Sequence, residues 1–243
     1  MMLYVVGFGS GAGECMTGAA EKALKDSDVI IGYTTYTELV KPFFPDKEYL
    51  ETGMRQEVDR VRLALERSLT DKVALVCSGD PELYGMAALC YEHLEEFPDA
   101  EIKVIPGVTA AFSGGAVLGA PLTHDTAIIS LSDLLTPMEK IECRLRCAAE
   151  GDFVIVLYNP SSRKRSDYLQ KACDIILKYR DPETVCGYVK NIGREGEESY
   201  ICTLAELRNE SVDMFTTVYI GNSETKIIAG KMITPRGYDK KEI

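Results

Sequence analysis

The sequence alternates between short apolar runs and segments with helical spacing, and this pattern most constrains the fold. Three early runs end at Gly7, Cys77 and Ile105, and a glycine-rich or small-residue loop follows each of them. Strands buried on both faces are apolar throughout, whereas half-exposed strands alternate between apolar and polar residues. The pattern therefore predicts an α/β fold with a mainly parallel sheet covered by helices.

A second set of alternations begins after Gly119–Leu122, so we expect two α/β domains, residues 1–120 and 121–243, with mainly parallel or mixed sheets. The predicted strands cover residues 3–7, 29–32, 73–77, 102–105, 127–131, 153–158, 184–189, 215–220 and 227–228. The predicted helices cover residues 17–25, 56–69, 84–96, 109–118, 137–149, 166–179 and 204–209, and Thr17 is the expected N-cap of the first.

Charge and composition exclude several classes of protein. The 27 Lys and Arg residues against 38 Asp and Glu give a net charge of −11, which disfavours a nucleic-acid binder. Hydrophobic residues make up 46% of the chain, enough to build a core. No apolar run approaches the roughly 18 residues of a membrane span. The first residues carry no basic leader or signal-peptide pattern, so we expect a cytoplasmic protein without a membrane partner.

The eight cysteines favour packing over metal binding. None forms a Cys-x-x-Cys pair, and only Cys143 and Cys147 lie close together, at i,i+4 on a predicted helix. Two thiols on one helix face need further ligands to hold a metal. We therefore expect mainly buried, reduced thiols that act as small hydrophobic side chains, and no metal site.

Loops at the carboxyl ends of parallel strands are where ligands gather in such folds. Residues 7–13, 78–85, 106–110, 158–165 and 190–194 are loops of this kind, which predicts a binding cleft between the two domains. The spacing of Gly7, Gly9 and Ala12 matches a dinucleotide fingerprint on paper. Helical spacing starts only at Thr17, however, and no acidic residue ends the second strand, so an NAD or FAD site is a weak alternative.

Several residues in these loops have alternative interpretations. Asp80, after Gly79, suits a ribose diol or an amine, or it simply caps the next helix. The small residues after Pro106 admit a flat ligand at a helix start, or they permit tight packing against the sheet. The basic run 163–165, with Lys190 and Arg194, suits a ligand with several carboxylates, or it is a solvated helix start.

Of the two histidines, His93 lies among glutamates and is interpreted as a surface residue. His124, next to Asp125 in a loop at the predicted domain boundary, is a candidate general acid or base, or an ordinary loop histidine. The Gly-x-Ser-x-Gly motif of serine hydrolases is missing.

Four segments in order resemble the tetrapyrrole methyltransferases, which use S-adenosyl-L-methionine: Val6–Gly11, Ser78–Pro81, Pro106–Ala110 and Asn191–Arg194. Segments 119–125, 129–137, 157–163 and 191–196 are similar to the branch that methylates carbon 17 of precorrin-3B or cobalt-precorrin-3 in cobalamin biosynthesis. The resemblance runs from Leu3 to about Met232. It implies two α/β domains with the cofactor in the cleft between them, a tetrapyrrole substrate and a homodimer.

The resemblance also implies roles for individual residues. The expected contacts of S-adenosyl-L-methionine, or of its product S-adenosyl-L-homocysteine, are Ser10, Gly79, Asp80, Leu83, Thr109, Ala110, Tyr158, Val189 and Thr216. The expected substrate contacts are Gly9, Gly11, Arg163 and Arg194. Ser10 stands where relatives often have proline, so its loop contacts either the cofactor or only the substrate. The chain ends at Ile243 without the cysteine-bearing extension of some relatives, so no iron–sulfur cluster is carried over.

The implied reaction agrees with the absence of a nucleophile–base pair. An electron-rich ring carbon attacks the methyl group of a sulfonium directly, so the protein contributes orientation and exclusion of water. In this branch methylation is accompanied by ring contraction, which needs proton transfers, and His124, Asp125 and Lys190 are the candidate catalytic groups. The alternatives are a carbon-11 methyltransferase acting on cobalt-precorrin-4, an NAD(P)-binding Rossmann oxidoreductase, and a non-catalytic binding module.

Overall fold

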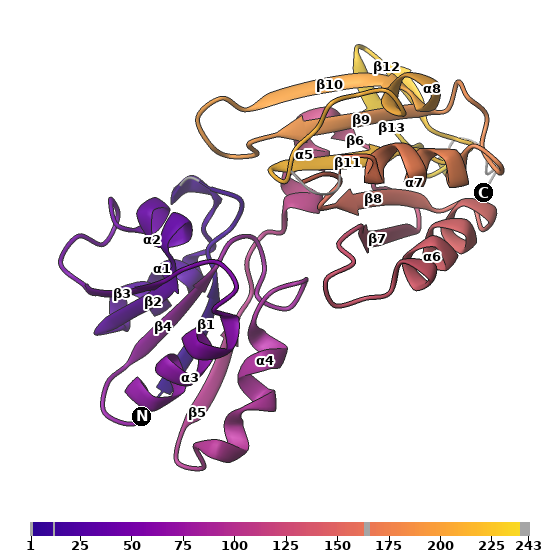
Figure 1. Ribbon diagram of the computed structural model, residues 1–243. Coiled ribbons are helices and arrows are strands. Elements are labelled where there is room, and N and C mark those ends of the chain that lie inside the picture. The colour runs from indigo at the N-terminus through magenta and orange to yellow at the C-terminus, as the bar shows by residue number, and fades with distance from the viewer. Residues whose placement is uncertain (1, 12, 163–165, 239–243) are drawn as a thin grey trace. The chain divides into compact units, whose positions relative to one another are not determined.

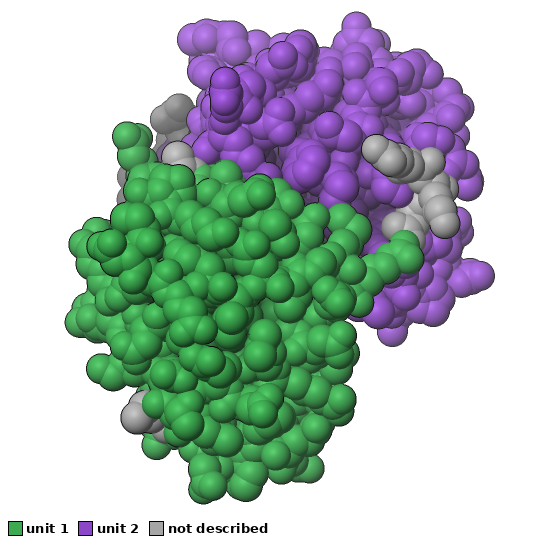
Figure 2. All heavy atoms as spheres, turned by 60° about the vertical axis from the view of Figure 1, so that its left-hand side comes forward, with its two compact units in different colours: residues 1–110 green, residues 111–243 purple. Residues whose placement is uncertain are grey.

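The computed structural model describes residues 2–11, 13–162 and 166–238 of the chain (Figure 1). It contains two compact units, Met1–Ala110 and Ala111–Ile243, which Figure 2 colours green and purple. The units divide at the start of helix α5, while the sequence pattern places a boundary at residue 120. Each unit carries its own sheet and its own core.

Unit 1 is built on a parallel sheet of five strands in the order β3-β2-β4-β1-β5. The strands are β1 Met2–Gly7, β2 Val29–Tyr33, β3 Glu48–Thr52, β4 Val73–Cys77 and β5 Glu101–Ile105. The helices are α1 Gly18–Asp26, α2 Thr34–Val40, α3 Glu57–Arg67 and α4 Ala87–Glu92, with 3₁₀ turns at Gly13–Cys15 and Leu94–Glu96. The predicted N-cap is confirmed, since the Thr17 hydroxyl accepts the N–H of Ala20 at 3.1 Å.

Unit 2 carries a mixed sheet in the order β10-β9-β11-β8-β7, in which only β7 and β8 are parallel. Its strands are β7 Thr126–Ser130, β8 Val154–Tyr158, β9 Val185–Lys190, β10 Glu198–Thr203 and β11 Thr216–Ile220. A small sheet joins β6 Gly119–Ala120, β12 Lys226–Ile228 and β13 Lys231–Ile233. The helices are α5 Ala110–Leu118, α6 Met138–Glu150, α7 Tyr168–Ile176 and α8 Leu204–Leu207. The prediction of an α/β fold with parallel and mixed sheets is confirmed.

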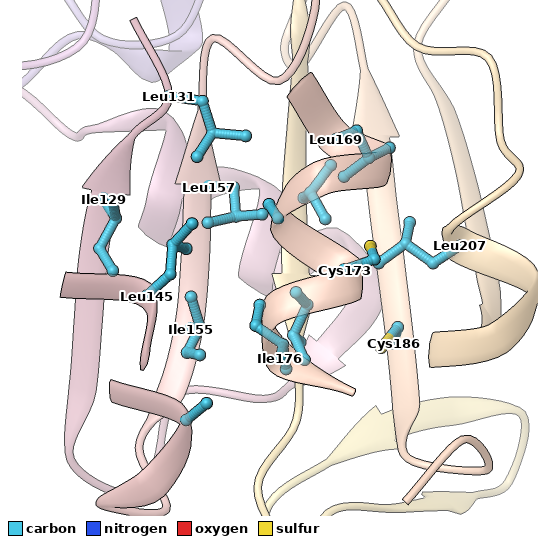
Figure 3. Close-up of a cluster of buried hydrophobic side chains, with 14 of the residues drawn as sticks. Ile129, Leu131, Leu145, Ile155, Leu157, Leu169, Cys173, Ile176, Cys186 and Leu207 are labelled. Carbon is cyan, nitrogen blue, oxygen red and sulfur yellow. The ribbon is translucent and has the colours of Figure 1, made fainter. Parts of the chain in front are cut away.

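The cores explain why the strands read as unbroken apolar runs. In β1, Val5 packs into one cluster with α3, and Val6 packs into another with α1, so both faces of the sheet are covered. Unit 2 has a large cluster in which Leu157 of β8 meets Leu145 of α6 and Leu169 of α7 (Figure 3). Full burial of one such side chain stabilises the folded protein by roughly 1.5–3 kcal/mol.

The structure corrects the sequence pattern at several elements. Helix α4 begins at Ala87 rather than Tyr84, because Tyr84 adopts a left-handed φ of 58° and Ala87 N–H bonds to the Pro81 carbonyl at 2.9 Å. Helix α2 and strands β3, β6, β10 and β13 were not predicted. Strand β10 is mostly polar and exposed at the edge of its sheet, so it lacks the apolar signal of a central strand.

The cysteines divide by burial. Four are buried, two are half-buried, and Cys143 and Cys147 are exposed on α6. Across residues 2–11, 13–162 and 166–238, no cluster of His, Cys, Asp and Glu that could hold a metal is found. In the same residues, no helix is both long and apolar enough to cross a membrane.

Candidate active site

Three loops of unit 1 interlock at one edge of its sheet. Strands β4, β1 and β5 are neighbours, so the loops that follow Cys77, Gly7 and Ile105 leave the sheet side by side. The backbones of Gly9 and Gly79 exchange two hydrogen bonds, with N···O distances of 3.1 and 2.7 Å. This bridge extends the pairing of β1 and β4 beyond the strands and fixes the two loops against each other.

Glycine is required where these loops touch. A Cβ atom on Gly107 would lie 2.1 Å from the Gly79 carbonyl oxygen, and one on Gly7 would lie 2.6 Å from the same atom. Contacts below 3.0 Å with backbone cannot be relieved by a side-chain rotation. Gly79 itself has a φ of +70°, a conformation that side chains other than glycine rarely adopt. Gly7, Gly79 and Gly107 are therefore needed for the packing and conformation of these loops.

Asp80 joins two of the loops through its carboxylate. One carboxylate oxygen accepts the N–H groups of Glu82 at 2.8 Å and Leu83 at 3.3 Å, and the other accepts the N–H of Gly107 at 3.0 Å. Both oxygens are thus occupied by backbone donors. The structure contradicts the capping interpretation, because α4 begins only at Ala87 and Met86 is its N-cap. Asp80 instead stabilises the turn that contains Glu82 and Leu83 and joins it to the loop of Gly107.

Ser10 is the best structural candidate for a ligand contact in unit 1. Its residue is 5% exposed, and its hydroxyl has no hydrogen-bond partner in the described part of the chain. Buried polar atoms almost always have partners, so an orphaned one calls for an explanation such as a missing ligand. Ser10 follows the Gly9–Gly79 bridge, and the neighbouring Gly11 is also buried. These residues fit a polar ligand at the carboxyl edge of the sheet.

The start of α5 is held by two tyrosines of unit 2. The Ala111 N–H donates to the Tyr158 hydroxyl at 2.8 Å, and the Tyr219 hydroxyl donates to the Ala111 carbonyl at 3.0 Å. Burial raises the pKa of Tyr219, so its hydroxyl stays neutral and able to donate. A Cβ atom on Gly114 would lie 2.4 Å from that hydroxyl, so at this position the small residue serves tight packing.

The predicted contacts Thr109 and Ala110 directly precede this anchored residue. Thr109 is 7% exposed and lies at the end of the loop after β5. Together with Ser10 and Gly79, these residues belong to the loops at the carboxyl edge of the unit 1 sheet.

Across the sheet of unit 2, Tyr158, Thr217 and Val189 form a row on one face. Val189 pairs with Thr217, and Leu157 pairs with Val218, which brings Tyr158 opposite Thr217 one step along the ladder. Thr216 points to the other face, and its hydroxyl donates to Asp213 at 2.9 Å. Thr217 is not among the predicted contacts; strand alternation, applied to the correct register, is the signal that places it on the face of Tyr158 and Val189.

Two basic side chains lie at the same end of this sheet as Tyr158. The ammonium group of Lys190 lies 5.7 Å from the Tyr188 ring centre and 5.8 Å from the Tyr200 ring centre. The Arg194 guanidinium lies 5.6 Å from the centre of the Phe215 ring. Aromatic faces attract both cations and orient them. The third predicted basic group, Arg163 in the run 163–165, lies outside the described residues.

His124 and Asp125 lie at the opposite end of the unit 2 sheet. They precede β7, whose first residue, Thr126, pairs with Val154, whereas its last residue pairs with Tyr158. Four residues of strand, or roughly 13 Å, separate the two ends. Within unit 2 the structure therefore does not bring His124 and Asp125 together with Lys190.

Comparisons with known proteins agree with this fold. The model of the family described as "Tetrapyrrole (Corrin/Porphyrin) Methylases" matches residues 2–208. A probable cobalt-factor III C(17)-methyltransferase of Methanocaldococcus jannaschii is 47% identical over 100% of both chains. A precorrin-3B C(17)-methyltransferase of a Sinorhizobium species is 37% identical, over 97% of this chain and 96% of the relative.

One relative and one solved structure extend the comparison. The chain spans 53% of the cobalamin biosynthesis protein CbiHC of Archaeoglobus fulgidus, with 45% identity over 98% of its own length. The crystal structure of the methyltransferase CobJ matches with a TM-score of 0.89 and 33% identity, over 96% of this chain and 99% of that one.

The chain belongs to the tetrapyrrole methylase family. It is an S-adenosyl-L-methionine-dependent tetrapyrrole C-methyltransferase, as the sequence resemblance predicts.

Proposed function

We propose that this chain transfers a methyl group from S-adenosyl-L-methionine to carbon 17 of cobalt-factor III or precorrin-3B in cobalamin biosynthesis, and that it contracts the macrocycle. The observation that carries the proposal is the match to the Methanocaldococcus jannaschii C(17)-methyltransferase, 47% identical over the full length of both chains. The Sinorhizobium relative, named for the same carbon, supports the position of methylation.

The cofactor contacts that we propose in unit 1 are the hydroxyl of Ser10, which has no hydrogen-bond partner among the described residues, the backbone of Gly79, and Thr109 with Ala110. When bound, the cofactor supplies an electrophilic methyl group. The interlocked loops hold these contact residues in fixed positions, which lowers the entropy lost on binding. Asp80 acts in this proposal by fixing the loops through the three backbone N–H groups that its two oxygens accept. Leu83 belongs to the same turn and donates its backbone N–H to Asp80.

In unit 2 we propose Tyr158, Val189 and Thr217 as the remaining cofactor contacts, with Thr217 in place of Thr216. Thr217 shares its face with the other two, whereas the Thr216 hydroxyl bonds to Asp213. Arg194 and Lys190 are proposed contacts of substrate carboxylates. Gly9 and Gly11 remain predicted substrate contacts.

For the proton transfers of ring contraction, Lys190 is the candidate that we retain. Its ammonium group lies at the sheet end that carries Tyr158, over two tyrosine rings, and its strand position pairs with Thr216 on the opposite face from Tyr158. The distance of His124 and Asp125 from that end argues against one acid–base group made of all three. The predicted homodimer and cytoplasmic location stay predictions.

The proposal is tested by incubating the chain with cobalt-factor III and methyl-labelled S-adenosyl-L-methionine. We expect label in the tetrapyrrole at carbon 17, located by NMR, and a product mass that reports the contraction. Label at carbon 11 would favour the cobalt-precorrin-4 alternative, and binding without turnover would favour a binding module. The oxidoreductase alternative loses its main support, since α1 begins only at Gly18 and the loop at Gly9 packs on Gly79 instead of opening into a helix.

A further inference from the structure

The turn between β3 and α3 is a rigid feature to which the proposed function assigns no role. It comprises Gly53–Gln56 at the carboxyl end of β3. The Gly53 N–H donates to the Gln56 side chain at 2.6 Å, and the Gly53 carbonyl accepts from the Arg60 guanidinium at 2.8 Å. A further Arg60 nitrogen donates to the Thr52 hydroxyl at 2.5 Å. The side chains of Gln56 and Arg60 therefore hold the start of the turn through hydrogen bonds.

Arg55 is held in this turn in a conformation that costs energy. Its φ is 65°, in the left-handed region that residues other than glycine and asparagine rarely enter. The residue is exposed, and within the described residues its guanidinium has no hydrogen-bond or ion-pair partner. Strained residues with unused polar groups persist where the surrounding structure imposes them, and such positions cluster at functional sites.

The turn is bonded to a buried cation, Arg60, that forms no ion pair in the described part of the chain. Arg60 is 4% exposed, and its neighbours are the Thr52 hydroxyl, the Gly53 carbonyl, the Met86 sulfur at 3.4 Å and the Tyr33 ring at 5.9 Å. No carboxylate forms an ion pair with it in the described part of the chain. Burial lowers the pKa of its guanidinium, yet an arginine at neutral pH stays charged. The Glu57 charge offsets part of this buried positive charge without an ion pair, and the remainder makes the surface near the turn more positive.

The position of the turn connects it to the candidate active site. All strands of the unit 1 sheet are parallel, so the carboxyl end of β3 lies at the same end of the sheet as the loops that carry Ser10 and Gly79. Two strand spacings, roughly 10 Å, separate β3 from β4. Met54, beside Arg55, is 57% exposed and offers apolar surface. A free guanidinium beside exposed apolar surface suits a ligand that is both apolar and anionic.

We propose that Arg55 binds a peripheral carboxylate of the tetrapyrrole substrate, and that Arg60 acts as a positioning residue that fixes the turn and adds to its positive potential. This inference rests on the proposed function and extends it to a residue that determines substrate affinity. Arginine suits the role because its planar guanidinium pairs with a carboxylate through two parallel hydrogen bonds.

The experiment measures the KM for cobalt-factor III, kcat, the Kd for S-adenosyl-L-homocysteine and the Tm of Arg55→Ala, Arg55→Gly and Arg55→Lys variants. Arg144→Ala is the matched control, since Arg144 is an exposed arginine on α6 in unit 2. We expect Arg55→Ala and Arg55→Gly to raise KM about ten- to hundredfold, as for one lost charge-assisted interaction. Arg55→Lys gives a smaller rise, and the kcat and cofactor Kd of all three stay within about twofold.

Arg55→Gly separates binding from folding. Glycine tolerates the left-handed φ, so this variant should have a Tm equal to or above that of the unchanged protein while its KM rises. Arg60→Lys should raise KM without changing the cofactor Kd. In the Arg60→Lys protein, the additional change Arg55→Ala should raise KM only slightly further. An unchanged KM in Arg55→Gly, with the parent enzyme active, overturns the inference and leaves the proposed function intact. A parent chain that does not methylate cobalt-factor III overturns the proposed function instead.

Discussion

Replacement of Asp80 by alanine distinguishes a carboxylate that holds loops together from one that contacts the cofactor directly. The change removes the acceptor of three backbone N–H groups. The Glu82 N–H is exposed and can bond to water, so its loss costs little. The part-buried Gly107 N–H loses a charge-assisted bond worth roughly 1.5–3 kcal/mol, and the Leu83 N–H loses part of another. We expect a loss of about 2–4 kcal/mol from the free energy of unfolding of unit 1.

For a unit of about this size, 1 kcal/mol shifts Tm by roughly 4 °C, so the expected decrease is about 8–16 °C by differential scanning calorimetry. Asp80→Asn is the matched variant. It keeps one acceptor oxygen but turns an amide N–H₂ toward the Gly107 N–H, so its decrease should be smaller. Cofactor affinity, measured by titration calorimetry with S-adenosyl-L-homocysteine, should fall in the same order as Tm. An Asp80→Ala protein with an unchanged Tm and a lost cofactor affinity would refute the reasoning, because only a direct ligand contact gives that result.

Three further predictions follow from other parts of the structure. Gly114→Ala should destabilise the protein by about 1–3 kcal/mol in urea unfolding, because the new Cβ meets the Tyr219 hydroxyl at 2.4 Å. Addition of Tyr219→Phe should recover part of that loss, and strict additivity of the two changes would contradict the contact. Burial alone would raise the pKa of Asp152, but hydrogen bonds from Ser223 and the Arg180 charge outweigh it and lower that pKa. The stabilisation is therefore present above the unfolded pKa of about 3.9 and lost as pH falls through the folded value, and Asp152→Asn should flatten the acid limb of Tm against pH. In a native thiol titration at pH 8, Cys143 and Cys147 should react before Cys77, Cys90, Cys173 and Cys202, because burial raises the pKa of these four thiols to about 11 or 12. Fast reaction of any of these four would show that its cluster opens.

The strand assignments show how far local pattern reaches. The run from Val73 to Cys77 predicts β4 residue for residue, because a strand buried on both faces is apolar throughout. The helix expected at Tyr84 starts at Ala87, because the Asp80 carboxylate and a left-handed Tyr84 stabilise a turn instead. The hydrogen bond of Asp80 to Gly107 joins residues 27 positions apart, and a pattern of neighbouring residues carries no signal for it.

The candidate site also has one part that the sequence predicts and another that only the structure shows. The four glycine-rich or small-residue motifs determine the family, since their order and types are local properties of the chain, and the family model confirms this interpretation. Strand direction and register in unit 2 decide the rest. The antiparallel placement of β9 and β11 puts Thr217 beside Val189, and the parallel pairing of β7 with β8 puts His124 at the far end from Tyr158.

The sequence by itself determined the α/β class, the enzyme family and the loops in which we propose the site, because each depends on residue types at short spacing. Only the tertiary structure decided which of those residues are free to act. In the described residues it gave the Asp80 carboxylate three backbone donors, left the Ser10 hydroxyl without a hydrogen-bond partner, and held Arg55 in a left-handed turn that is bonded to the buried Arg60. Whether a polar group is already satisfied depends on atoms that folding brings from distant parts of the chain.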